Sequence, residues 1–257
     1  MNVYDFDGTI YYPDCTISFA LWCAKRHPKL WFTFVPKAVR NLILYNRGKL
    51  PRYKMERQFF GFLGMTDDFE EQIEKFWDKH EKRISAWYLA QKKPGDLIIS
   101  ASPDCIIAPI AKRLGVKYMA SEYDREFGVF TNNLMYAKEK ARYMIDHGFP
   151  VIDNFYSDSL SDTPIALCAE KAYLITDKAR KVNDWPDMDE ETLKKVHRKI
   201  CFKQEKCANL GKNSLLSHLY QRAIAAIPII QRIIPLSHRF DTAISASKKP
   251  YTNWREN

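Results

Sequence analysis

Short apolar runs that favour strands alternate along the chain with longer segments of helical period. The first run, Asn2 to Phe6, is rich in the β-branched and aromatic residues that suit a pleated backbone, and Gly8 ends it. Later runs predict strands at Leu97 to Ile99, Val116 to Ala120, Val151 to Ser157 and Ala172 to Ile175. Strands that alternate with helices indicate an α/β fold, with a three-layer, Rossmann-like parallel sheet as its core.

The helices of this core are marked by their end residues. One is predicted to begin with Ser102 as its cap and Pro103 in its first turn, to kink or break early at Pro109 and to close at Gly115. The other predicted elements are a hairpin-like segment at Phe127 to Tyr136 and helices at Glu139 to His147 and Thr163 to Glu170.

Between the first two strands the pattern is helical throughout. The predicted helices are Ile17 to Lys25, Leu30 to Tyr45, Arg52 to Phe62 and Asp67 to Ala90. We therefore expect residues 1–13 and 94–180 to form the core, and residues 14–93 to form an all-helical cap inserted over the carboxyl ends of the strands. Residues 181–257 are predicted to be a helical C-terminal extension and tail.

Charge and cysteine usage narrow the classes of function. The 257-residue chain carries 40 Lys and Arg against 31 Asp and Glu, a formal net charge of +9, which suits an anionic substrate or surface. The basic residues are scattered among apolar ones and match no nucleic-acid-binding motif, so we expect no nucleic-acid partner. Six cysteines without metal-type spacing predict reduced thiols. Because the first predicted strand begins at residue 2, we do not expect export by a cleaved leader. We expect a cytoplasmic protein.

The first predicted strand ends in two carboxylates. Asp5 and Asp7 should point the same way, because side chains alternate along a strand. Unpaired, they would repel by about 4 kcal/mol at a separation of about 4 Å near a protein surface. A cation is therefore expected beside them, although the motif alone also fits an acidic turn.

Three further groups follow other predicted strands. They are Ser100 to Ser102, the pair Lys138 and Lys140, and the pair Asp158 and Asp162. Singly, each fits a helix cap or a solvated position. Together they suit phosphate chemistry, because a carboxylate that attacks a phosphoester needs a metal and a cation to neutralise the charge. Magnesium prefers oxygen ligands, and a hydroxyl with helix-start amides can hold phosphate oxygens.

In this order, the motifs DFDGT, IISAS, a following Lys and SDSLSD resemble the four signature motifs of the haloacid dehalogenase superfamily. The insertion between the first two motifs resembles the helical cap of its phosphoserine-phosphatase-like branch. The resemblance covers roughly residues 1–180.

The resemblance implies a role for each matching position. Asp5 would be the nucleophile that forms an aspartyl-phosphate, and Asp7 the acid/base that also offers its backbone carbonyl to Mg²⁺. Asp158 would be the second metal carboxylate, and Asp162 would steady the lysine or the metal waters. The implied phosphate-binding residues are Ser100, Ala101, Gly8, Thr9 and Lys140, with Lys138 as the alternative lysine.

The implied activity is magnesium-dependent hydrolysis of a phosphomonoester. Dehalogenase relatives lack an acid at the position of Asp7 and transport ATPases carry Thr there, so Asp7 favours a phosphatase. A phosphotransferase would keep the same residues, and a non-catalytic binding protein is a further alternative. The implied substrate is a small phosphorylated metabolite such as phosphoserine. Asp14 stands where phosphoserine phosphatases carry Glu, and Arg52 could bind a substrate carboxylate.

A second hypothesis places the cap against an anionic membrane. Residues 27–49 are apolar and basic, as interfacial helices are, and are too short and too charged to span a bilayer. A bacterial phosphatidylglycerophosphate phosphatase branch of the superfamily has a similar apolar cap and a similar YSDS motif. Residues 215–239 could add a second anchor at the inner face of the membrane. Ordinary packing of these helices onto the core is the alternative explanation.

Overall fold

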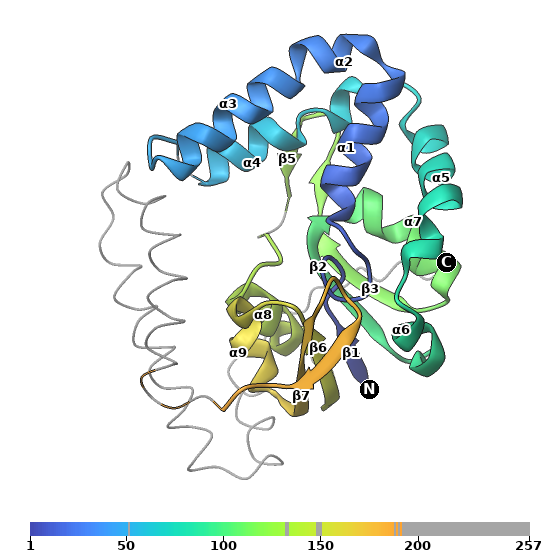
Figure 1. Ribbon diagram of the computed structural model, residues 1–257, viewed down its shortest axis with the longest axis vertical. Helices are drawn as coiled ribbons and strands as arrows, with labels where there is room; N and C mark the ends of the chain where they lie inside the picture. Colours follow the sequence, from blue (N-terminus) through green and yellow to red (C-terminus); the bar gives the residue numbers. More distant parts are fainter. Residues whose placement is uncertain (51, 132–133, 148–150, 188, 190, 192–257) are drawn as a thin grey trace. The chain divides into compact units, whose positions relative to one another are not determined.

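The computed structural model describes residues 1–50, 52–131, 134–147, 151–187, 189 and 191 (Figure 1). The chain divides into two compact units, residues 1–141 with 150–209 and residues 142–149 with 210–257. The sheet, the inserted helices and all the site residues discussed below belong to the first unit.

A mixed, mostly parallel sheet of Rossmann-like type organises the first unit. Its described strands lie in the order β3-β2-β1-β6-β7-β8, and each neighbouring pair is parallel except β7 and β8. Their bounds are β1 Asn2–Tyr4, β2 Leu97–Pro103, β3 Lys117–Ser121, β6 Ile152–Ser157, β7 Ala169–Thr176 and β8 Lys181–Asp184.

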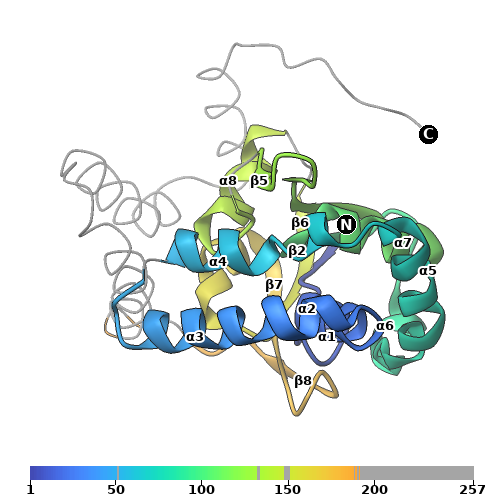
Figure 2. The ribbon, with the colours of Figure 1, turned by 90° about the horizontal axis from the view of Figure 1, so that it is seen from above.

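Helices fill the segment between β1 and β2 and flank the sheet. The inserted helices are α1 Cys15–Arg26, α2 Pro28–Thr33, α3 Val35–Asn46, α4 Arg52–Phe60, η1 Leu63–Met65, α5 Phe69–His80, η2 Glu81–Arg83 and α6 Ala86–Gln91. We call this segment, residues 14–93, the cap. Within it, α3 and α4 lie side by side (Figure 2). Beyond β2 follow α7 Asp104–Leu114, the hairpin of β4 Tyr123–Asp124 and β5 Val129–Phe130, α8 Lys138–Asp146, η3 Leu160–Asp162 and α9 Thr163–Ala166.

A row of tyrosines crosses one face of the sheet. Tyr4 of β1 pairs in register with Tyr156 of β6, which pairs with Tyr173 of β7. The first two rings stack at 4.7 Å between centroids and the second two at 4.9 Å. Offset stacking of aromatic rings adds to the stabilisation from burial, so this row fixes the register of the strands that carry the site.

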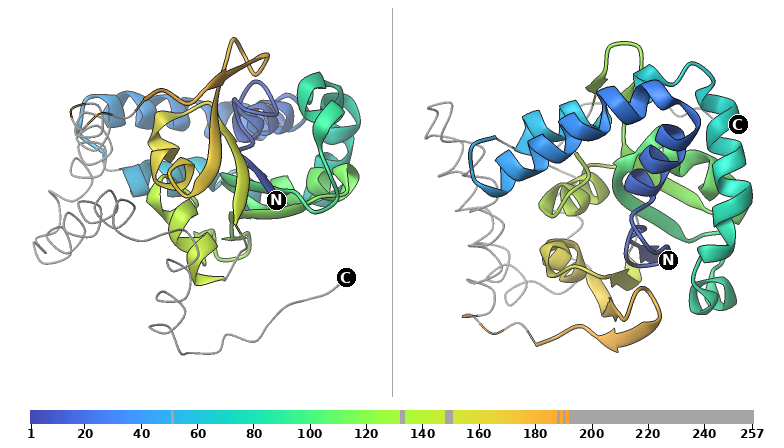
Figure 3. Two further views of the ribbon diagram at one scale, coloured as in Figure 1. Left: turned by 90° about the horizontal axis from the view of Figure 1, so that it is seen from below. Right: turned by 45° about the horizontal axis from the view of Figure 1, so that its top comes forward.

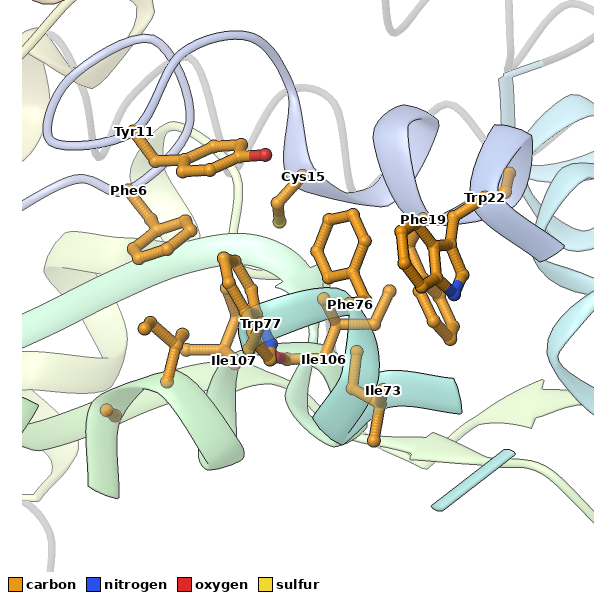
Figure 4. Close-up of a cluster of buried hydrophobic side chains, with 14 of the residues drawn as sticks. Phe6, Tyr11, Cys15, Phe19, Trp22, Ile73, Phe76, Trp77, Ile106 and Ile107 are labelled. Atoms are coloured by element: carbon orange, nitrogen blue, oxygen red, sulfur yellow. The ribbon is translucent and has the colours of Figure 1, made fainter. Parts of the chain in front are cut away.

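A second aromatic cluster joins the cap to the sheet (Figure 4). Phe6, which follows β1, packs against Trp77 of α5, and the Trp77 indole donates a hydrogen bond of 3.0 Å to the carbonyl of Ile106 in α7. Phe19 of α1 meets Phe76 of α5 in the same cluster. Burying a large apolar side chain stabilises the fold by about 2 kcal/mol. The cluster therefore holds α1 and α5 against the end of β1, which Asp5 directly follows.

Two helices predicted in the cap are each divided into shorter elements in the structure, so their predicted limits are wrong. Asp67 to Ala90 separates into α5, η2 and α6, because Ile84 pairs with Tyr11 and the Ser85 amide donates to the carbonyl of Ile10 at 2.8 Å. These contacts draw the chain back to the loop after β1. Leu30 to Tyr45 separates at Phe34, the residue between α2 and α3.

Predicted elements outside the cap also change at their ends. The helix predicted at Thr163 to Glu170 stops at Ala166, because residue 169 already pairs with β6. The helix expected from Ser102 begins at Asp104, and Pro109 lies inside it without ending it. The predicted hairpin at Phe127 to Tyr136 is formed further upstream by β4 and β5.

The helical extension predicted from residue 181 is wrong at its start. Residues 181–184 form β8, which returns along β7 as an antiparallel edge strand (orange in Figure 3). Backbone with positive φ at Asp177, Lys178 and Ala179 makes the turn between the two strands. Most of the rest of that extension, including the apolar segment 215–239, lies outside the described residues. The division into core, cap and extension stays a prediction.

Two findings concern the setting of the protein. The described cysteines, Cys15, Cys23, Cys105 and Cys168, are free thiols, and Cys201 and Cys207 lie outside the described residues. Within the described part of the chain, no helix combines the length and the apolar character needed to cross a bilayer.

Candidate active site

Three adjacent parallel strands bring the predicted groups to one edge of the sheet. Asp5 directly follows the end of β1, Ser100 lies in β2, and Asp158 directly follows β6. β1 lies between β2 and β6 and runs parallel to both. Because the carboxyl ends of parallel strands face the same way, the three side chains converge, as their order in the sequence predicts.

A cavity of about 530 Å³ opens at this edge between the strand ends and the cap. Its acidic lining residues are Asp5, Asp7, Asp14, Asp158 and Asp162, and its basic lining residue among those described is Lys140. Asp5 and Asp158 therefore face the same space. Five carboxylates with one ammonium group leave an excess of negative charge, which favours a cation in the cavity.

Lys140 joins two of these carboxylates. Its Nζ lies 2.6 Å from Asp5 Oδ1 and 2.8 Å from Asp162 Oδ2, and all three side chains are buried. Ser157 Oγ also donates to Asp162 Oδ2, at 2.9 Å. Burial disfavours the charged ammonium, but the Asp162 and Asp5 carboxylates outweigh it and raise the pKa of Lys140. The lysine is thus held protonated beside the expected nucleophile.

The carboxylates themselves are harder to ionise than usual. Burial raises the pKa of Asp5 to about 7, with Asp162 and Asp158 adding to the shift and Lys140 opposing it. Burial likewise raises the pKa of Asp158 to about 6, again with Lys140 opposing and Asp162 adding. A divalent cation bound here would favour the ionised forms.

Gly8 makes room for Asp158. Its backbone has φ of +77°, and a Cβ at this position would lie 2.1 Å from Asp158 Oδ2. No side chain other than hydrogen fits so close an approach. The glycine of the first motif therefore lets the Asp158 carboxylate lie against the loop after Asp5.

Asp7 accepts hydrogen bonds at both of its carboxylate oxygens. Its Oδ1 accepts the Cys15 amide at 2.6 Å, and its Oδ2 accepts Ser102 Oγ at 2.6 Å. Burial raises the pKa of Asp7 to about 8; the negative charge of Asp14 adds to the shift, and the hydrogen bonds from Ser102 and Cys15 oppose it. A carboxyl group of this pKa keeps its proton near neutral pH, as a general acid requires.

The predicted phosphate-binding residues fall into two sets. Ser100 and Ala101 line the cavity together with Lys140. Gly8 and Thr9 lie beside the cavity and are not among its lining residues: the Gly8 amide donates to the Tyr11 carbonyl, and Thr9 Oγ1 accepts the Asp158 amide at 2.9 Å. Their contact with phosphate stays a prediction.

The remaining predicted residues have distinct positions. Asp14 lines the cavity and also caps α1, accepting the Ile17 amide at 2.8 Å. Arg52 is the first residue of α4, and its side chain lies outside the described part of the structure. Lys138 lies 3.7 Å from the Glu139 carboxylate, and Lys140 alone of the two lysines is a lining residue of the cavity.

The residues present fit a magnesium ion that is held by few protein ligands. Among the described residues, no cluster of three or more acidic, histidine or cysteine side chains could hold a metal. Mg²⁺ does not need such a cluster, because it commonly keeps several waters and binds one or two carboxylates. Asp5 and Asp158 supply two carboxylates to one cavity, and because burial raises the pKa of both, a bound cation would stabilise their ionised forms.

Sequence reasoning missed three residues of this site. Cys15 and Thr16 enter it from the first turn of α1, and Ser157 enters from the last residue of β6. Ser157 could have been inferred, because it stands directly before the acidic motif at a strand end. Nothing in the sequence indicates Cys15 or Thr16, since their contacts depend on how α1 meets β2.

The family model of haloacid dehalogenase-like hydrolases matches residues 3–167, which include every described site residue. This chain belongs to that family of hydrolases. The match covers β1, the cap and the sheet as far as β6, so the family assignment rests on the same segment that builds the cavity.

This haloacid dehalogenase-like hydrolase is similar in sequence or in structure to several known proteins. Protein CicA of Caulobacter vibrioides is 28% identical over 190 residues, which covers 67% of this chain and 84% of that protein. A protein of unknown function from Bordetella pertussis Tohama I superposes with a TM-score of 0.55 at 19% identity and covers 67% of this chain and 87% of its own. A phosphoserine phosphohydrolase-like protein from Francisella tularensis gives a TM-score of 0.44 at 17% identity, covering 68% of this chain and 88% of its own.

Proposed function

We propose that this hydrolase is a magnesium-dependent phosphomonoester phosphatase that works through an aspartyl-phosphate on Asp5. The observation that carries the proposal is the position of Lys140, 2.6 Å from Asp5 and 2.8 Å from Asp162 in a cavity that Asp7 and Asp158 also line. A protonated lysine beside an aspartate nucleophile can neutralise the phosphoryl oxygens as the nucleophile approaches.

The reaction has two steps. An Asp5 carboxylate oxygen bonds to phosphorus, the ester P–O bond breaks, and the Asp7 proton passes to the leaving oxygen to give the alcohol. Ionised Asp7 then takes a proton from water, the water oxygen bonds to phosphorus, and the Asp5–phosphorus bond breaks to release inorganic phosphate. Asp7 ends protonated and Asp5 ends as a carboxylate, so the cycle closes.

Asp5 and Asp158, with the Asp7 backbone carbonyl, would hold Mg²⁺. When bound, the ion neutralises charge on the phosphoryl oxygens and on the nucleophile. Ser100 lies at the same edge of the sheet, where its hydroxyl can donate to a phosphoryl oxygen. Asp162 holds Lys140 in place through the bond of 2.8 Å.

The test is turnover of p-nitrophenyl phosphate with and without Mg²⁺. We expect the Asp5→Asn variant to lose turnover and to lose the acid-stable phosphoenzyme that labelled substrate leaves on the wild type. The exposed acid Asp67 offers a matched control, and Asp67→Asn should keep both. Full turnover by Asp5→Asn would refute the proposal.

A small metabolite such as phosphoserine is the first candidate substrate. Asp14 supports it, because one carboxylate oxygen caps α1 while the side chain still lines the cavity and can meet a substrate ammonium. The free thiols of the described cysteines support the predicted cytoplasmic setting, where such metabolites occur.

A second candidate is a lipid phosphate that is held at a membrane surface. The cap supplies many apolar side chains to the cavity, namely Ile17, Ala20, Leu21, Phe34, Val35, Ala38, Val39, Leu42, Met55, Phe59 and Phe60. Phe32 of α2 is 77% exposed, and the exposed side chains of Lys29 and Lys37 lie near it in sequence. Apolar and basic groups that are exposed on the two consecutive helices α2 and α3 favour an anionic bilayer.

Vesicle binding separates the two candidates. We expect the wild type to pellet with phosphatidylglycerol vesicles and to remain in solution with phosphatidylcholine vesicles if the lipid candidate holds. Phe32→Ser should then reduce pelleting, whereas Phe127→Ser, which alters an equally exposed ring on the β4–β5 hairpin, should not. Absence of pelleting at low salt would leave the soluble metabolite as the substrate class.

A further inference from the structure

A chain of buried hydroxyl groups leads from the cap to Asp7. Thr16 Oγ1 donates to Ser102 Oγ at 2.9 Å, and Ser102 Oγ donates to Asp7 Oδ2 at 2.6 Å. A serine hydroxyl has one hydrogen to donate. Because Thr16 donates to Ser102, the Ser102 hydrogen is directed to Asp7.

The other Asp7 oxygen is held from the same turn of the cap. Cys15 precedes Thr16 in the first turn of α1, and its amide donates to Asp7 Oδ1 at 2.6 Å. The Cys15 thiol lies 3.4 Å from Asp7 Oδ2 and packs in the aromatic cluster of Figure 4. The carboxylate of Asp7 is therefore fixed between the first turn of α1 and the end of β2.

Ser102 donates to Asp7 and does not cap the helix that follows it. A serine before Pro103 and Asp104 would ordinarily cap the next helix, but α7 begins at Asp104 with no side-chain cap bond. The pairing of β2 with β3 shifts register between Ile99 and Pro103, which keeps Ser102 within the strand. The irregular register of β2 thus includes Ser102, the residue that contacts Asp7.

We infer that Ser102 and Thr16 are positioning residues for Asp7, the proton-transfer group of the proposed function on which this inference rests. They set the direction of the Asp7 carboxyl group, and they tie it to α1. Ile17 and Leu21 of the same helix line the substrate cavity. A substrate that packs against α1 therefore contacts the element that also holds the acid.

The inference is tested with two substrates that differ in their leaving group. An alkyl phosphate needs a proton on its leaving oxygen, whereas nitrophenolate leaves p-nitrophenyl phosphate without one. kcat/KM reports the steps up to loss of the leaving group. For Ser102→Ala we expect kcat/KM to fall about 100-fold with the alkyl phosphate and to stay within about threefold with p-nitrophenyl phosphate.

Companion variants separate positioning from folding. Thr16→Val should show the same preference with a smaller loss of about tenfold, without any change to β2. Ser102→Thr and Thr16→Ser, which keep the hydroxyl groups, should retain wild-type ratios. Ser18→Ala is the matched control, since Ser18 donates to the Asp14 carbonyl on the same helix at 2.7 Å and does not contact Asp7 in the described structure.

Each contrary result has a definite meaning. Equal losses with both substrates, or no loss, in Ser102→Ala and Thr16→Val would overturn the inference while the wild type remains a phosphatase. A wild type that turns over neither substrate would overturn the proposed function, and the inference with it.

Discussion

Among the residues that the structure describes, Lys140 is the basic residue that lines the cavity, and its neighbour Lys138 allows a test of its proposed role. Lys140 is 2% exposed, whereas Lys138 is partly exposed and lies near Glu139. Spacing along the sequence left both lysines open, since they are two residues apart. Only the direction in which each side chain leaves the helix separates them.

Lys140→Met should disable the enzyme, and Lys138→Met should not. Removing the buried ammonium leaves Asp5 and Asp162 without their partner, so we expect the free energy of unfolding to fall by about 3 kcal/mol. We expect kcat/KM to fall by about 100-fold or more, since a group that neutralises the phosphoryl charge is lost. Urea unfolding and turnover measure the two effects. A larger loss of activity in Lys138→Met would reverse the assignment.

Gly8 offers a second test at the level of one residue. Gly8→Ala places a Cβ 2.1 Å from Asp158 Oδ2, so we expect the Asp158 carboxylate to move and Mg²⁺-dependent turnover to fall by about 100-fold. Positive φ alone costs an alanine about 1 kcal/mol. Gly115→Ala controls for that cost, because Gly115 has φ of +67° and a Cβ there meets nothing within 4 Å.

The Gly8 result is judged by comparison of the two variants. Calorimetric titration with Mg²⁺ should show weakened binding in Gly8→Ala and unchanged binding in Gly115→Ala. If both variants bind the ion as the wild type does, Asp158 is not a ligand.

At the scale of elements, the sequence predicts strands better than helix limits. Each predicted parallel strand is present, because a buried strand needs a short apolar run and little else. The limits of α5, α6 and α9 escaped prediction because tertiary pairing decides them. Ile84, for example, leaves the helical pattern to pair with Tyr11. The same reason hides the contacts of Ser102, whose local motif indicates a helix cap.

The acidic groups of the site were easier to predict than their supports. Asp5 and Asp158 each follow a strand, and topology alone brings the ends of adjacent parallel strands together. Thr16 and Ser102 are 86 residues apart, and their hydrogen bond depends on the register shift in β2 and on how α1 starts. A sequence pattern carries no direct record of such geometry.

Helix α3 allows a prediction about the substrate. Leu42 lines the cavity, and its neighbour Ile43 is similarly exposed but is not a lining residue. For a long-chain alkyl phosphate, we expect Leu42→Glu to raise KM about tenfold, because a charge replaces apolar contact worth about 0.8 kcal/mol per methylene. Ile43→Glu should leave KM unchanged. KM for glycerol phosphate should not respond to either variant.

The outcome decides between the two substrate classes. Equal effects of Leu42→Glu on the long-chain and the short substrate would show that the apolar wall does not contact the substrate chain. The small metabolite would then be favoured over the lipid phosphate.

At the scale of the whole molecule, the charge of the cavity lining is opposite in sign to the net charge of the chain. The chain has a net charge of +9, yet the described residues that line its cavity include five aspartates and one lysine. The buried carboxylates therefore work against folding when they are ionised without a cation. Their raised pKa values express this cost.

Stability should consequently depend on pH and on Mg²⁺ together. The pKa values of Asp5 and Asp158, about 7 and about 6, lie above the ordinary 3.8. Between the ordinary and the raised values, the folded protein without metal therefore binds more protons at these two groups than the unfolded chain does. Its free energy of unfolding must then fall as pH rises from about 4 to about 7.

Mg²⁺ binds the ionised carboxylates and competes with those protons. At a fixed Mg²⁺ concentration, about a hundred times the Kd at pH 8, we expect the ion to add about 2.7 kcal/mol to the free energy of unfolding at pH 8 and little at pH 5. Thermal unfolding at both pH values measures the difference, and Asp158→Asn should remove it. An equal effect of Mg²⁺ at both pH values would mean that the ion binds elsewhere.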